Sequence, residues 1–106
     1  MNSTFLGGRV DSEIIMAEVA NGKTVANFLM ATKHRDKIDV HRIVAWDEAA
    51  KIALLLRKGD PVFIEGRIQT RNVGEGEQRR REVEIVAWTI YPIKGRFEME
   101  GRVSNG

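Results

Sequence analysis

One predicted strand carries a row of polar and cationic side chains on a single face. Within residues 61–71, Arg67, Gln69 and Arg71 are spaced two apart, and strand residues at this spacing point to the same face of a sheet. Arginine binds a phosphate through two parallel hydrogen bonds or lies flat against a base. A solvated strand face is the ordinary alternative, and Glu65 in the same register supports it. We favour a ladder of side chains that binds a polyanion.

Further cations lie next to turns. Arg79, Arg80 and Arg81 follow a glycine-bearing loop at 72–78, so a hairpin is expected to bring them directly across from the ladder and merge the two groups into one stripe. Lys33 and Arg35 belong to the polar segment KHRDKID, which we interpret as a loop. These cations matter more by their placement than by their sum, since the formal net charge is only +2.

The aromatic residues suggest different roles. Trp46 ends a β-rich segment on the same face as Arg42, which favours base stacking over core packing. Simple alternation places Trp88 on one face with Ile90, so we expect it to pack or to lie in an interface. Phe63 is on the polar face of its strand, where a contact between subunits is favoured.

The titratable residues lack the patterns that catalysis or metal binding needs. The chain has no cysteine, and its two histidines, His34 and His41, show no metal-ligand spacing. Neither lies beside an identifiable nucleophile or a glycine-rich phosphate loop. We therefore predict that the protein is not an enzyme and uses no metal or other cofactor.

Composition predicts a soluble globular domain. The chain has 106 residues, of which 42% are hydrophobic and 30% charged, values typical of a folded domain. No apolar run approaches the roughly 20 residues of a membrane span, and the first residues do not resemble a signal peptide. We expect a cytoplasmic location and no membrane partner.

The alternation of apolar and polar residues predicts five strands, at 4–19 with a turn or bulge near 11–12, 24–32, 40–46, 61–71 and 79–93. Asn21-Gly22 predicts a tight hairpin between the first two. One helix is expected between the third and fourth strands, with Asp47 as its N-cap and Lys58-Gly59 as its end. This order predicts an all-β fold, a five-stranded Greek-key barrel of the oligonucleotide/oligosaccharide-binding (OB) type. The spacing alone leaves an SH3-like barrel open.

The last part of the chain differs from the rest. Residues 94–106 lose the periodicity and contain three glycines, so we expect a flexible tail after a single nucleic-acid-binding domain at 1–93.

Five segments carry a resemblance to a known family, in matching order and spacing: FLGGRV, NGKTVANFLMAT, VHRIVAW, LRKGDPVFIEGRIQTR and EVEIVAW. Over residues 4–93 the chain resembles the bacterial single-stranded DNA-binding proteins. The resemblance implies an OB fold, a homotetramer, and binding of single strands without strong sequence preference during replication, recombination or repair.

The resemblance also implies roles for single residues. Trp46 matches a stacking aromatic, and Arg42, Gln69 and Arg71 match polar or basic binding positions, although arginine is common in the family at position 69. His41 matches a histidine that the family uses near its subunit interface.

Several family features are missing. Val40 and Val73 stand where tryptophan is usual, and the segment 33–39 offers His34 and Arg35 in place of a third tryptophan. We expect weaker binding per nucleotide, a larger electrostatic share, or a different path of the strand. The acidic, aromatic-ending C-terminus of the family is also absent, which implies a shortened chain or a paralogue (phage, plasmid or accessory).

We predict a nucleoid-associated, non-enzymatic protein that binds single-stranded DNA. The predicted binding residues are Lys33, Arg35, Arg42, Trp46, Arg67, Gln69, Arg71, Arg79, Arg80 and Arg81, and the predicted interface residues are His41 and Phe63. RNA binding stays open because stacking and phosphate contacts serve both polymers. One alternative is a primosome-type accessory protein that acts mainly through replication or repair proteins. Another is a structural or oligosaccharide-binding OB module.

Overall fold

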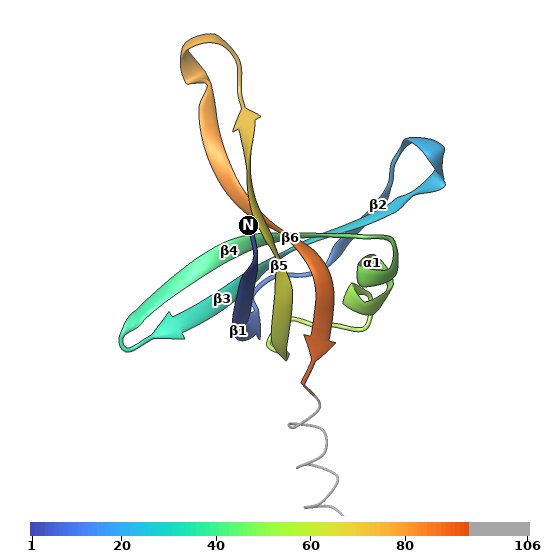
Figure 1. Cartoon of the computed structure of the whole chain (residues 1–106), viewed down its shortest axis with the longest axis vertical. Helices are drawn as coiled ribbons and strands as arrows, with labels where there is room; N and C mark the ends of the chain where they lie inside the picture. The colour runs from blue at the N-terminus through green and yellow to red at the C-terminus, as the bar shows by residue number, and fades with distance from the viewer. Residues whose placement is uncertain (94–106) are drawn as a thin grey trace, which may run out of the picture.

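Six strand segments and one short helix form the fold in the computed structural model, which describes residues 1–93 (Figure 1). The elements are β1 (Thr4–Val10), β2 (Ile15–Glu18), β3 (Thr24–His34), β4 (Lys37–Trp46), α1 (Asp47–Ala53), β5 (Pro61–Val73) and β6 (Arg80–Pro92), with single 3-10 turns at Ala20–Gly22 and Gly76–Gln78.

The strands close into a barrel. Their order is β1-β5-β6-β4-β3-β2, and β1 also pairs with β3 through Arg9 and Val10, which closes the sheet on itself. β4 and β6 run parallel, and the other pairs are antiparallel. β1 and β2 are the two halves of the first predicted strand, so the predicted five-stranded OB-fold barrel with one helix is confirmed.

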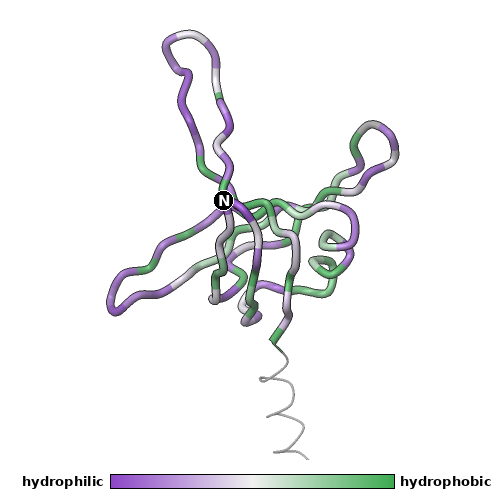
Figure 2. Tube along the Cα trace, in the orientation of Figure 1, coloured by the Kyte–Doolittle hydropathy of each residue, from purple (hydrophilic) through white to green (hydrophobic). Residues whose placement is uncertain are grey.

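The core is aliphatic and lies inside the barrel. Its largest fully buried side chains are Met30, Ile43, Ile64, Val10 and Val62. Helix α1 covers one end of this core with alanines, and their small side chains let the helix axis come close to the strands. Figure 2 shows the resulting contrast, with hydrophobic residues in the barrel and hydrophilic ones along the projecting β5–β6 hairpin.

Two glycines permit close approaches that the barrel requires. A Cβ atom on Gly8 would lie 2.0 Å from the Ala31 carbonyl oxygen, at the junction of β1 and β3. A Cβ atom on Gly66 would lie 2.1 Å from the Val86 carbonyl oxygen, where β5 crosses β6. Any larger side chain at either position would push the strands apart.

A β-bulge near the end of β6 changes which of its residues point toward the core. Glu65 pairs with Thr89 but the next residue, Gly66, pairs with Ala87, so Trp88 is the extra residue. Ile90 consequently joins Ile85 and Ala87 in the core and is 2% exposed. The expectation that Trp88 and Ile90 share a face was wrong, because simple alternation has no way to register an inserted residue.

Three hairpins extend from the barrel (Figure 1). In the β2–β3 hairpin, Asn21 and Gly22 have φ of 74° and 72°, as the predicted Asn-Gly turn requires. In the β3–β4 hairpin, pairing continues to His34 and Lys37, so residues 33–39 are mostly strand and not the expected loop. The β5–β6 hairpin is the long arm, in which Ile68 is exposed although it continues the buried face of β5.

The helix ends differ from the expectation. Asp47 lies inside α1 with a φ of 51°, Trp46 is the N-cap residue, and no side chain caps the helix start. The helix ends at Ala53. Gly59 instead belongs to the turn before β5, where its N–H donates to Val10. The predicted tail at 94–106 lies outside the described residues.

Candidate nucleic-acid interface

The side of the sheet that faces away from the core brings five of the ten predicted binding residues together. Strand pairing places Leu29 of β3, Arg42 of β4, Glu84 of β6 and Gln69 of β5 side by side. We call this surface the outer face, and its residues are Asn27, Leu29, Arg42, Val44, Trp46, Arg67, Gln69, Arg71, Glu84 and Val86. It alternates along each strand with the buried core positions.

The predicted ladder on β5 has the expected orientation. Arg67, Gln69 and Arg71 share one side of the strand. Their partners across the arm, however, are Val86, Glu84 and Glu82 in that order. Arg79, Arg80 and Arg81 were expected directly across from the ladder, and this expectation was therefore wrong.

Those arginines lie nearer the tip of the arm. Arg80 pairs with Val73 and Arg81 pairs with Asn72, while Arg79 precedes the strand. Together with Asn72 they line an open hollow of about 460 Å³. Because neighbouring strand residues point to opposite sides, Arg80 and Arg81 do not share a face, and the cations do not form one continuous stripe.

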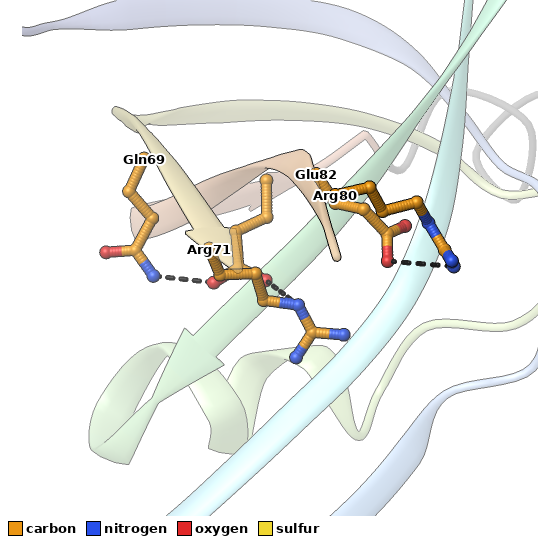
Figure 3. A network of polar contacts seen from close by, with 5 residues as sticks. Gln69, Arg71, Arg80 and Glu82 are labelled. Carbon is orange, nitrogen blue, oxygen red and sulfur yellow. Dashed lines mark hydrogen bonds and ion pairs between the residues drawn. The ribbon is translucent and has the colours of Figure 1, made fainter. Parts of the chain in front are cut away.

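A carboxylate in the middle of the outer face holds two members of the ladder (Figure 3). Glu84 is 6% exposed. Gln69 Nε2 donates to its Oε1 at 2.5 Å, and Arg71 Nε lies 3.8 Å from its Oε2. Farther along the arm, Arg80 Nη2 lies 3.6 Å from Glu82 Oε1. Sequence reasoning gave Glu84 no role, because the partner of Gln69 depends on the exact register of the hairpin, which alternation along one strand does not give.

The remaining binding residues are on or next to the same surface. Trp46 ends β4 with 39% of its surface exposed, opposite Val25 of β3. Lys33 continues the outer-face side of β3 toward the hairpin tip, where Arg35 occupies the turn with a φ of 55°. A hollow of about 270 Å³ opens beside Arg42, and its lining is Ser12, Glu13, Ile15, Asn27, Phe28, Leu29 and Arg42.

The two predicted interface residues lie elsewhere. His41 is on the other side of β4, where its Nε2 is 2.8 Å from Thr32 Oγ1. Phe63 is exposed at the barrel end of β5 and stacks on Phe5, with ring centroids 5.5 Å apart. Tyr91 joins them at 6.5 Å from Phe5. Sequence reasoning missed Phe5 and Tyr91, because only strand pairing shows that the three rings meet.

Trp88 does not pack in the barrel. It is the bulged residue and is 51% exposed, which removes the core-packing half of its prediction and leaves the interface half as a prediction. Within residues 1–93 there is no group of three or more histidines and carboxylates arranged to hold a metal ion. No helix in that range is long and apolar enough to cross a membrane.

Comparison with known proteins decides the family. The model of the Single-strand binding protein family matches residues 1–93, which is most of the chain. The chain belongs to this family. A solved structure described as "Plasmodium falciparum SSB complex with ssDNA" is similar to it with a TM-score of 0.76 and 31% identity, over 88% of this chain and 95% of that one.

Curated relatives from bacteria agree. Single-stranded DNA-binding protein 1 of Chlorobaculum tepidum is 37% identical over 68% of this chain. Single-stranded DNA-binding protein of Neisseria meningitidis serogroup B is 31% identical over 95% of the chain, and protein 2 of Listeria innocua is 31% identical over 99%. The matched regions are 51%, 64% and 72% of those three proteins, so the chain spans about half to three quarters of their length.

Proposed function

We propose that this member of the single-strand binding protein family binds single-stranded DNA without strong sequence preference, covering exposed strands during replication, recombination or repair. The observation that carries the proposal is the gathering of Arg42, Trp46, Arg67, Gln69 and Arg71 on one sheet face of a family member. Its function is binding, and the proposal includes no catalytic step.

Two physical terms supply the affinity. The arginines neutralise phosphates and release counterions, which makes the affinity fall as salt rises. Stacking of a base on Trp46 adds about 1–3 kcal/mol and tolerates any sequence, because every base has a π-face. Lys33 and Arg35 add positive charge along one hairpin, and Arg79, Arg80 and Arg81 add positive charge near the tip of the arm.

The proposal includes assembly into a homo-oligomer, with a tetramer as the expected form. The exposed rings of Phe5, Phe63 and Tyr91 support it, since exposed aromatic clusters are typical of interfaces. His41 is the second proposed interface residue.

A titration with oligo-dT at two salt concentrations, followed by tryptophan fluorescence, tests the proposal. We expect quenching that is weaker at high salt and largely lost in Trp46→Ala. Trp88→Ala is the matched control, because Trp88 is the other tryptophan of the chain and does not belong to the outer face. Equal binding at both salt concentrations would contradict the proposal.

The exposed aliphatic residues of the outer-face strands favour a second candidate. Val40 is 52% exposed on β4, at a position where the family resemblance implies a stacking tryptophan. A primosome-type accessory protein, which binds DNA weakly and acts through replication or repair proteins, would tolerate this loss. Weak, unquenched oligo-dT binding together with capture of a replicative helicase or its loader would favour this candidate.

A further inference from the structure

In the middle of the outer face, a buried carboxylate fixes the orientation of the Gln69 side-chain amide. Gln69 Nε2 donates to Glu84, and Glu84 is almost completely buried. An ionised carboxylate only accepts hydrogen bonds, so the amide must turn its NH₂ group toward Glu84. The carbonyl oxygen of Gln69 therefore points away from Glu84, as Figure 3 shows.

That carbonyl oxygen is open to a ligand. Within residues 1–93 it pairs with no donor, and no buried side-chain nitrogen or oxygen atom in this range lacks a partner. The oxygen is therefore in contact with solvent. Gln69 itself is flanked along the same face of β5 by Arg67 and Arg71, each two residues away.

An exposed acceptor selects its ligand by polarity. Phosphate oxygens are acceptors themselves and would be repelled, whereas each of the four bases carries N–H donors on its edges. We propose that Gln69 contacts bases and not phosphates, so that a bound strand turns its bases toward the centre of the outer face while Arg67 and Arg71 hold phosphates. This inference rests on the proposed function and assigns Glu84 as the positioning residue.

The proposed base contact depends on the pairing of Gln69 with Glu84 in this chain. An arginine at position 69, which the family resemblance makes common, would present donors and bind phosphate. Gln69 with Glu84 presents an acceptor instead. Because all bases have a donor, the contact distinguishes base from backbone without selecting a sequence.

The test compares two oligonucleotides, oligo-dT and the same length made with 3-methylthymine, which lacks the ring N–H. One neutral hydrogen bond is worth about 0.5–1.5 kcal/mol, so we expect the wild-type protein to bind the methylated strand about two- to twelvefold more weakly. Gln69→Leu should bring this ratio down to the purely steric effect of the methyl group. Gln78→Leu, in the exposed turn at the arm tip, should keep the wild-type ratio.

Glu84→Gln tests the positioning role separately. Its amide can donate as well as accept, so Gln69 is free to turn over and the ratio should fall toward that of Gln69→Leu. Circular dichroism checks that each variant is folded.

The possible results distinguish a failure of the base contact from a failure of the proposed function. The same ratio in the wild type and in Gln69→Leu would overturn the base contact, and a wild-type ratio in Glu84→Gln would overturn the role of Glu84. If the wild type binds neither strand in a salt-sensitive way, the proposed function fails.

Discussion

Arg71 shows how a side chain on the outer face is both held and available. Its Nε lies near Glu84 in the sheet, while the side chain as a whole is about half exposed. The guanidinium group has five N–H donors, so the contact with Glu84 leaves others for a phosphate. Glu84 thereby orients Arg71 and leaves some of its N–H donors available to a ligand.

We expect Arg71→Ala to weaken oligo-dT binding and to make it less sensitive to salt. Loss of one phosphate contact should lower the slope of log affinity against log salt by about 0.7 for a single strand. Lys51→Ala is the control, since Lys51 lies on α1 and pairs with Glu48. An unchanged slope in Arg71→Ala would remove this residue from the interface.

A second residue-scale prediction concerns the closure of the barrel. Gly8→Ala would force a Cβ atom against the Ala31 carbonyl, and we expect a loss of about 3 kcal/mol or more in the free energy of unfolding. Gly22→Ala meets no atom within 4 Å and should cost only about 1 kcal/mol, from its positive φ. Urea denaturation measures both, and equal losses would contradict the close approach.

For single residues, the sequence predicted only those properties that depend on near neighbours in the same strand. The common face of Arg67, Gln69 and Arg71 follows from alternation alone. Their partners across the arm do not, because the hairpin register depends on the loop, where Gly74 and Gly76 take positive φ. For that reason the importance of Glu84 was not visible.

At the scale of the elements, strands with one buried face were predictable and the others were not. Residues 33–39 were assigned to a loop because both faces of this projecting hairpin are solvated, which erases the apolar alternation. The helix end was placed too late because the apolar pattern continues through Leu56, which is buried although it follows the helix. Burial alone does not show where helical hydrogen bonding stops.

The bulge in β6 gives an element-scale prediction. Ile90→Ala should lower the free energy of unfolding by about 2–5 kcal/mol, since Ile90 is in the core. Trp88→Ala should cost less than about 1 kcal/mol, because the bulge leaves that side chain mostly exposed. Thermal or urea unfolding distinguishes this register from simple alternation, in which the two losses would be similar.

At the scale of the whole molecule, we expect Phe63→Glu to reduce the size of the assembly while the fold is kept. A charge among Phe5, Phe63 and Tyr91 could not be buried between subunits without a large desolvation cost. Size-exclusion chromatography with light scattering measures the mass. Leu55→Glu is the control, an equally drastic change at an exposed leucine after α1. A wild-type monomer would contradict the assignments of both Phe63 and His41.

The parallel pairing of β4 with β6 has a consequence for the order of folding. The β3–β4 and β5–β6 hairpins are local and can form within about 1–10 μs, but the pairing of Ile43–Ala45 with Ile85–Ala87 joins distant parts of the chain and must form later. Arg42 and Trp46 are on one side of this seam, and Gln69 and Arg71 are on the other. A DNA strand that contacts both sides would stabilise the closed seam, so amide hydrogen exchange at these residues should slow when DNA binds.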